Sequence, residues 1–393
     1  MSEWKEYKLK DLGRVVTGNT PSSKFPEEFG NEMPFVTPSD YKNYNKWISF
    51  ADRNLSQKGI EKLQSRLLPK NSLLVTCIGS DMGKVAINKI PVISNQQINS
   101  IIPNENVDAD FLYYKLVESY DVLRMYGEAG TAVPIVNKTD FENIEIEIPS
   151  EKSEQTAIAE VLSSLDDKID LLHRQNATLE KMAETLFRQW FVEEAKEEWE
   201  EGTLDDILSV KGGTTPSTAE PSYWNGTIHW TTPKDITNLN GLFLFDTERK
   251  ITELGLSRIS SGLLPIGTLL MTSRAPVGVL AFAEIPLAIN QGYIAIIANK
   301  GYSKEFIYLW LKTNIDVVHS FSNGSTFMEI SKSTFKTLQL QIPPSDVLNN
   351  FQSIVAPLFT KIKSNSIQIR TLTALRDTLL PKLMSGEVRV EMN

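Results

Sequence analysis

The sequence has little cysteine and no long apolar run. Its single cysteine, Cys77, excludes an internal disulfide and favours a reducing compartment. We interpret Cys77 as a buried strand residue within the apolar run 73–78, in preference to a nucleophile. Glu284 interrupts the best candidate for a membrane span, and the opening MSEWKEYKLK lacks the apolar core of a signal peptide. We therefore expect a cytoplasmic protein without membrane contact.

Motifs for catalysis are also scarce. The three histidines, His173, His229 and His319, lie far apart and form no metal-ligand motif. The run GSDMGKV at 79–85 is one residue short of a phosphate-binding loop and ends in valine. The Asn/Asp-Pro-Pro-aromatic motif of methyltransferases that act on base amino groups is missing. An enzyme is thus the weaker class of protein, and we predict no catalytic residue and no metal ligand.

Basic residues do not outnumber acidic ones, which at first argues against a nucleic-acid partner. The formal net charge is −9. Residues 151–201 hold 14 acidic and 6 basic side chains, so this one segment accounts for −8 of that charge. The blocks 1–150 and 202–344 are close to neutral, and each could present a basic face.

Apolar residues recur at alternating steps of four and three through residues 151–191, a pattern typical of a heptad seam. A helix of about 40 residues would measure about 60 Å, too long for the interior of a compact domain, so it must connect separate parts. An interrupted second seam lies 193 residues later, where we expect Pro357 to delay or kink the helix. If the two helices pair, Asn176 and Asn365 would fix their register; alternatively, each is a solvated residue on a partly covered helix. The predicted seam comprises Leu162, Leu165, Ile169, Leu172, Asn176, Leu179, Leu186, Leu358, Ile362, Asn365, Ile369, Leu372 and Leu379.

The segments that precede the two helices are duplicated as well. An offset of 195 residues aligns more than ten identical residues within 37 positions, where average composition predicts about two. The turn at 18–22 falls on the turn at 213–217 with a shared G-x-T-P-S pattern, and Thr-Pro-x-Asp at 37–40 falls on 232–235. Because both copies keep the glycine and proline of the turn, we interpret it as architecture before a ligand-binding loop.

Each copy consists of short β-rich runs separated by Gly, Pro and Asn turns, with one amphipathic helix late in the copy, at 109–119 and 304–314. We predict an α+β fold with two homologous mixed α/β domains, each holding a curved and mostly antiparallel sheet. The predicted boundaries are 1–150 for the N-terminal domain, 151–196 for the central spacer helix, 197–344 for the second domain, and 345–393 for the second helix and tail.

A duplicated pair of domains with a helical spacer gives one chain a pseudo-twofold axis. B-DNA also has local twofold symmetry, and two such domains on one face of the duplex would lie about 34 to 36 Å apart. Because the copies have diverged in sequence, they would read two different half-sites on either side of an unread gap.

The order of domain, heptad helix, domain and helix resembles the specificity subunit of Type I restriction-modification systems. The resemblance rests on the G-x-T-P-S turns at Gly18 and Gly213 and on the Asn-Gln pairs at Asn95 and Asn290. It also rests on the helix text EVLSSLDDKIDLLHRQNATLEKMAETLFRQWF and the tail LRDTLLPKLMSGEVRV, and it extends over essentially the whole chain.

This resemblance implies two target-recognition domains that read a bipartite double-stranded DNA sequence, joined by an antiparallel coiled coil. It implies no catalysis and no cofactor in this chain. Two methyltransferase subunits would supply S-adenosylmethionine-dependent adenine methylation, and restriction subunits would supply ATP-driven translocation and Mg²⁺-dependent cleavage.

Candidate DNA contacts follow from side-chain chemistry. Lys, Arg and small hydroxyls suit phosphates, while Arg suits guanine and Asn or Gln suits adenine. We prefer loops in which the copies differ, and for each residue a solvated surface position is the alternative. The candidates are Lys24, Lys42, Asn43, Lys46, Ser80 and Lys84 in the first domain, Lys234, Asn238, Arg249, Arg274 and Ser325 in the second, and Lys138 and Lys332, matched in both copies, for phosphate or structural roles.

Docking of a methyltransferase subunit requires apolar helix surface that the seam does not use. Phe187 and Phe191 lie one step beyond the seam, and Leu380 occupies the place equivalent to Phe187. We nominate these three residues for partner contact, with packing on the domains as the alternative.

Two other classes of function stay open. The first is a duplicated protein-binding scaffold without DNA binding. The second is a Mg²⁺-dependent nuclease in which Asp235 and Glu248 imitate a metal-binding spacing, although the other copy carries Asp52-Arg53-Asn54 in the equivalent region.

Overall fold

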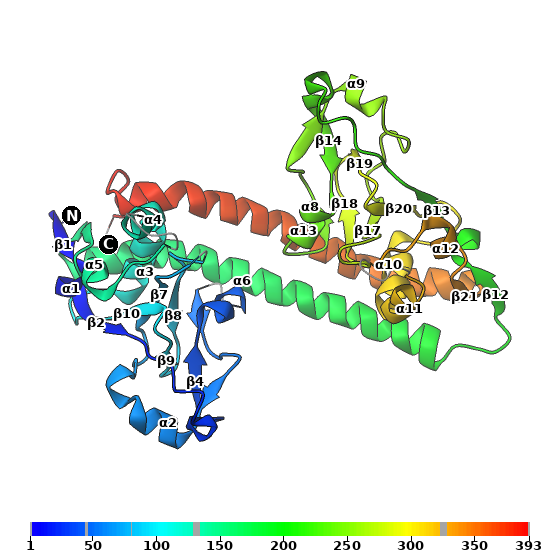
Figure 1. Ribbon diagram of the computed structural model, residues 1–393. Helices are drawn as coiled ribbons and strands as arrows, with labels where there is room; N and C mark the ends of the chain where they lie inside the picture. Colours follow the sequence, from blue (N-terminus) through cyan, green and yellow to red (C-terminus); the bar gives the residue numbers. More distant parts are fainter. Residues whose placement is uncertain (1, 44–45, 80, 129–133, 323–327, 392–393) are drawn as a thin grey trace. The chain divides into compact units, whose positions relative to one another are not determined.

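The computed structural model describes residues 2–391 apart from 44–45, 80, 129–133 and 323–327. The chain divides into two compact units (Figure 1). The first combines Met1–Lys168 with Leu372–Asn393, and the second is Ile169–Thr371. The long helices α6 (Lys152–Arg188) and α13 (Ser345–Met384) therefore each contribute residues to both units. The sequence suggested independent spacer segments, whereas packing assigns one part of each helix to each unit.

A five-stranded sheet forms the centre of the first unit. Its strand pairs are antiparallel except for the pair of β5 with β8, as the sequence predicted for most of the sheet. All four residues of the central strand β7 are buried, because the run LLVT is covered on both faces. In sheet order the strands are β2 (Gly13–Thr17), β10 (Ile98–Pro103), β7 (Leu73–Thr76), β8 (Val85–Asn88) and β5 (Trp47–Ile48).

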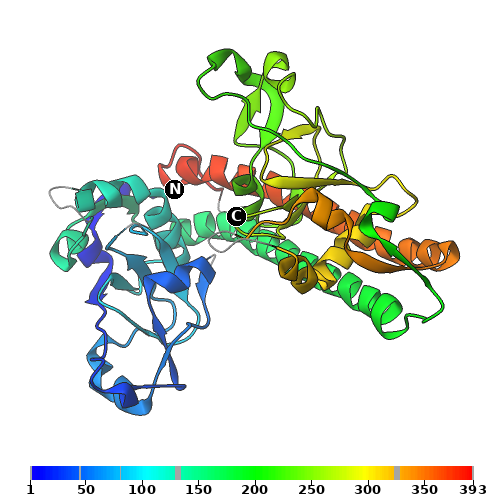
Figure 2. The ribbon, with the colours of Figure 1, turned by 45° about the vertical axis from the view of Figure 1, so that its right-hand side comes forward.

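Smaller elements complete this unit. We call the part of each unit outside the long helices α6 and α13 the first or the second module. A four-stranded sheet and helix α2 (Gln57–Lys62) form the end of the first module that lies away from α6, as both views show (Figures 1 and 2). In order, the small sheet contains β3 (Phe29–Gly30), β6 (Asn54–Leu55), β4 (Met33–Val36) and β9 (Ile93–Ser94). The remaining elements are the pair β1 (Trp4–Lys8) and β11 (Glu145–Pro149), the helices α1 (Leu9–Leu12), α3 (Ala109–Glu118), α4 (Tyr120–Glu128) and α5 (Lys138–Glu142), and the 3₁₀ turns η1 (Pro26–Glu28), η2 (Pro38–Asn43) and η3 (Gln64–Arg66).

The second unit repeats this plan, which confirms the predicted duplication. Its five strands follow the same order and again include one parallel pair, β15 with β18. The five are β13 (Ser209–Lys211), β20 (Tyr293–Ile297), β17 (Leu269–Thr272), β18 (Leu280–Ala283) and β15 (Phe243–Leu244). The small sheet contains β16 (Arg249–Ile251), β14 (Trp224–Thr231) and β19 (Leu287–Ile289), and a further pair joins β12 (Glu200–Thr203) to β21 (Gln339–Ile342). The other elements are η4 (Gln189–Glu193), η5 (Pro221–Tyr223), α7 (Leu204–Ile207), α8 (Pro233–Thr237), α9 (Glu253–Leu256), α10 (Lys304–Thr313), α11 (Ile315–Ser320) and α12 (Lys332–Lys336).

The amphipathic helix of each module, α3 or α10, packs on α6. The helices start where Asp108 and Ser303 cap their first amides. From α3, the Tyr114 hydroxyl donates to Asp166 at 2.6 Å, and from α10 the Tyr308 hydroxyl donates to Glu180 at 2.5 Å. Burial and the neighbouring carboxylate raise the pKa of both phenols, so they stay protonated donors. These equivalent contacts fix where each module lies along the helix that it covers.

Helices α6 and α13 pair antiparallel within the second unit. The amide nitrogen of Asn365 donates to the side-chain oxygen of Asn176 at 2.9 Å. Farther along, the Phe187 ring contacts the Phe351 ring, so rising numbers on α6 meet falling numbers on α13. Asn365 is fully buried. The predicted meeting of the two asparagines is confirmed.

The other predicted seam residues are also covered. Four of them are buried, namely Leu162, Ile169, Leu172 and Ile362. The remainder, Leu165, Leu179, Leu186, Leu358, Ile369, Leu372 and Leu379, are partly buried, as expected for a seam between only two helices.

The expected delay of the second helix at Pro357 is wrong, while the alternative, a kink at this proline, stays a prediction. Helix α13 begins at Ser345 and continues without a break through Pro357. Pro357 is exposed, so the carbonyl that loses its intrahelical donor can bond to water instead.

The C-terminal tail belongs to the first unit. Leu383 and Met384 are buried in the core of that unit, and Lys115 of α3 donates to the Met384 carbonyl at 3.0 Å. Beyond the helix, Arg389 donates to the Ser2 carbonyl at 3.1 Å. The first module is therefore completed by residues from both ends of the sequence.

Candidate nucleic-acid interface

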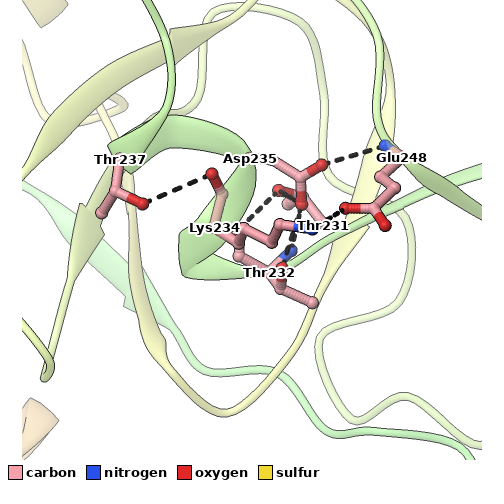
Figure 3. A network of polar contacts seen from close by, with 6 residues as sticks. All are labelled: Thr231, Thr232, Lys234, Asp235, Thr237 and Glu248. Carbon is pink, nitrogen blue, oxygen red and sulfur yellow. Dashed lines mark hydrogen bonds and ion pairs between the residues drawn. The ribbon is translucent and has the colours of Figure 1, made fainter. Parts of the chain in front are cut away.

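The repeated Thr-Pro-x-Asp sequence caps a short helix and fastens a neighbouring segment. In the second module, one oxygen of Asp235 accepts from the Thr232 amide at 2.7 Å in the capping box of α8 (Figure 3). Its other oxygen accepts from the Glu248 amide at 2.9 Å. The first module repeats both contacts, since Asp40 accepts from the Thr37 amide at 2.7 Å and the Asp52 amide at 2.8 Å. The repeated aspartate thus links a loop to the chain that enters the small sheet.

This geometry does not fit the Mg²⁺-nuclease alternative. Asp235 is occupied by backbone amides and by the hydroxyls of Thr231 and Thr232. The Glu248 carboxylate pairs instead with Lys234 at 2.9 Å, a contact that raises the pKa of the lysine (Figure 3). Among the described residues, no group of three or more His, Cys, Asp or Glu side chains could hold a metal ion.

The repeated G-x-T-P-S turn packs against the repeated Asn-Gln pair. Thr20 donates to Gln96 at 2.5 Å, and Thr215 donates to Gln291 at 2.7 Å. A Cβ on Gly213 would lie 1.8 Å from a backbone carbonyl of β19, so only glycine permits this approach. The interpretation of the turn as architecture is confirmed, and the turn also presents two exposed glutamines in a fixed place.

Most nominated DNA contacts are at the surface. Arg274 is partly exposed and the other members of this set are exposed, which agrees with either DNA contact or simple solvation. Ser80 and Ser325 lie outside the described residues. The surface set is Lys24, Lys42, Asn43, Lys84, Lys138, Lys234, Asn238, Arg249, Arg274 and Lys332.

Lys46 is the exception, and its nomination is wrong. Its side chain is buried, and its ammonium lies 2.5 Å from Asp110 and donates to Ser163 of α6 at 2.9 Å. The ring of Tyr114 covers it at 4.5 Å. A buried cation needs such partners, so Lys46 holds the module on α6 and cannot reach a phosphate.

Several surface cations already have an acidic neighbour. Lys84 lies 2.7 Å from Asp81, Lys138 lies 3.3 Å from Glu142, and the Arg274 guanidinium lies 3.8 Å from Glu329. The last pair sits where 274 and 329 form a β-bridge. Exposed pairs of this kind are weak, so a phosphate can replace the carboxylate.

The nominated partner-docking residues are largely used by the fold. Phe187 is buried in the core of the second unit, where its ring contacts Phe191 and Phe306, so its nomination is wrong. Phe191 is partly buried in the same cluster. Leu380 is partly buried against the core of the first unit.

Sequence reasoning missed Arg53. Its guanidinium lies over the Phe29 ring in the small sheet of the first module, as Arg249 lies over Trp224 in the second. The signal was available, because Arg53 aligns with Arg249 once a one-residue gap shifts the offset from 195 to 196.

Comparison with known proteins shows which family has this repeated arrangement. Residues 1–181 and 196–373 each match the family described as the Type I restriction modification DNA specificity domain. The chain belongs to this DNA specificity family. This membership confirms the prediction of a specificity subunit and speaks against the enzyme alternative.

Two relatives of this chain match along nearly its full length. The specificity subunit of the Type I restriction enzyme MjaIX from Methanocaldococcus jannaschii is 32% identical, over 99% of this chain and 94% of that protein. The HindI specificity subunit from Haemophilus influenzae is 23% identical, over 99% of this chain and 100% of that protein.

A solved structure has the same fold. The crystal structure of the S subunit of a Type I restriction-modification system from M. genitalium aligns with a TM-score of 0.62 at 19% identity. The alignment covers 100% of this chain and 97% of that one.

No helix among the described residues is long and apolar enough to cross a membrane.

Proposed function

We propose that this chain is the sequence-reading subunit of a Type I restriction-modification complex. Each module reads one half of a split double-stranded DNA target, and the paired helices α6 and α13 determine the length of the unread gap. The chain itself performs no catalysis and binds no cofactor. S-adenosylmethionine, ATP and Mg²⁺ act in partner subunits.

The duplicated specificity domain is the observation that carries this proposal. Both halves of one chain match the same DNA specificity domain, and the modules share a strand order while differing in their surface residues. Two unlike reading modules in one protein require a DNA target with two unlike parts.

The partners follow from the same proposal. Two methyltransferase subunits, one for each half-site, dock on this chain, and restriction subunits join them in the cytoplasm. The relatives that match along all or nearly all of their length are named as specificity subunits of restriction enzymes, which supports assembly with such partners. Phe191 and Leu380 remain candidates for this docking because each keeps part of its surface uncovered.

The decisive experiment compares genome-wide DNA methylation in cells with and without this chain. We expect adenine methylation at one split motif to depend on the chain. If the methylated motifs do not change when the chain is lost, the proposal is refuted. It is also refuted if the methylation that depends on the chain lies in a continuous, unsplit motif.

A second experiment tests the spacer. One heptad inserted into both α6 and α13 at paired positions preserves the seam and lengthens the spacer by about 10.5 Å. At 3.4 Å per base pair, we expect both half-sites to stay unchanged and the gap to grow by about three base pairs. The same seven residues inserted at the exposed residues 196–198, outside both paired helices, leave the length of the helices unchanged and serve as the control for general disruption.

A further inference from the structure

Each module holds one exposed arginine over a pair of perpendicular aromatic rings. In the first module, the Arg53 guanidinium carbon lies 3.9 Å from the centre of the Phe29 ring and 5.9 Å from that of Phe35. The two rings are 5.8 Å apart at an angle of 78°. Arg53 directly precedes β6, and its carbonyl accepts from the Phe35 amide at 2.9 Å.

The second module builds the same arrangement from different rings. The Arg249 guanidinium carbon lies 3.6 Å from the centre of a Trp224 ring and 5.5 Å from that of Trp230. These rings are 5.0 Å apart at 83°, and Arg249 pairs with Trp230 across β16 and β14. Phenylalanine has been replaced by tryptophan at both ring positions, yet the arginine and its distances are preserved.

The repeated aspartate fastens the residue before each arginine. Asp40 accepts from the amide of residue 52, and Asp235 accepts from the amide of residue 248. Because each amide belongs to the residue just before the arginine, the Thr-Pro-x-Asp cap and the aromatic pair together fix the guanidinium. One shared motif of the duplication therefore helps to position the same side chain in each module.

A guanidinium held in this way is prepared to bind an anion. Both arginines are exposed, and neither has an ion pair within the described part of the chain. The ring contact uses no oxygen acceptor, so the N–H donors of each guanidinium stay available to an anion. Since the side chain is already ordered, little rotamer entropy is lost when two of these donors bind the oxygens of a phosphate.

We propose that Arg53 and Arg249 are equivalent anchors for the DNA backbone, each binding a phosphate of its own half-site. The inference rests on the proposed function and names part of its DNA-binding surface. A base contact would differ between modules that read different bases, whereas every half-site offers the same phosphate. Preservation of the arginine over changed rings fits the shared ligand.

The test uses the full chain in complex with its methyltransferase subunits and measures affinity for the cognate DNA at several salt concentrations. The variants are R53Q, R249Q and the double variant. The slope of log K against log salt should fall by about one unit for each arginine removed, with binding about tenfold weaker or more per substitution at physiological salt. The methylated motif should stay unchanged. R53K and R249K keep the charge and should restore the slope.

R174Q is the matched control. Arg174 is an exposed arginine of α6 that pairs with Asp170 at 3.0 Å, and its removal should leave the slope unchanged. Thermal unfolding checks that each variant is folded.

Three results would overturn the anchor assignment. These are wild-type slopes in folded R53Q and R249Q variants, a motif relaxed at a single base, and loss of methyltransferase assembly with DNA affinity intact. If the wild-type complex shows no sequence-specific DNA binding at all, the proposed function itself has failed.

Discussion

Replacing the two asparagines between α6 and α13 should produce unequal effects, because only one of them is sealed from water. Asn365 is fully buried and donates to Asn176 at 2.9 Å, while its own side-chain oxygen has no hydrogen-bond partner within the described residues. Asn176 is partly exposed and can bond to water. The pair therefore contains one amide that is sealed from water and one that water can reach.

In Asn176→Leu, the buried amide of Asn365 loses its nearer acceptor and keeps only the Gln175 side-chain oxygen at 3.4 Å, at a cost of about 1–3 kcal/mol. In Asn365→Leu, the sealed amide disappears and an apolar side chain is buried, a gain of about 2 kcal/mol that offsets the lost hydrogen bond. The double variant should be the most stable, by about 2 kcal/mol over the wild type. It should also lose the register device, so we expect methylated sites with more than one gap length.

Native-state hydrogen exchange followed by mass spectrometry measures the opening free energy of residues 169–188 and 345–371 directly. The expected order of stability is double variant, Asn365→Leu, wild type and Asn176→Leu. The control is Thr178→Ala, an exposed substitution on α6 that tests for effects of helix propensity alone. Equal effects of the two single asparagine substitutions would refute the reasoning from burial.

Three further predictions concern single side chains. Burial raises the pKa of the Cys77 thiol to about 12, so a thiol-specific reagent should label it only after unfolding; rapid labelling of the native protein would contradict this. Burial opposes ionisation of Glu154, but hydrogen bonds from Ser2 and the charge of Arg389 outweigh it and lower its pKa. Its stabilising contribution is therefore complete above the ordinary pKa of 4.5 and is lost as pH falls through the lower folded-state pKa, and acid unfolding of Glu154→Gln should depend less steeply on pH. Asp235→Ala should destabilise the second module by about 1–2 kcal/mol in thermal unfolding, whereas Glu248→Gln, which removes only an exposed ion pair, should have little effect.

Periodic features were predictable from the sequence. The heptad pattern predicted that Asn176 and Asn365 meet, because residues at heptad spacing lie on the same face of a regular helix. The duplication was predictable because insertions between the copies are small, and the repeated strand order confirms it.

Single-residue assignments failed where distant partners decide burial. Lys46 was expected at the surface, but Asp110 and Ser163 enclose its charge, and neither is near it in sequence. Phe187 was placed outside the seam by its heptad position, although the adjacent domain covers that face of the helix. Arg53 was missed because its significance lies in the rings that it covers, and these are brought together only by the small sheet.

The discontinuity of the first unit has a consequence for synthesis. Leu383 and Met384 are part of its core, so the module that leaves the ribosome first must wait for these much later residues before its fold is complete. The second unit is one continuous segment and can finish earlier. A stop codon between residues 372 and 382 would consequently remove core residues of the unit that is synthesised first and leave the unit that is synthesised second intact.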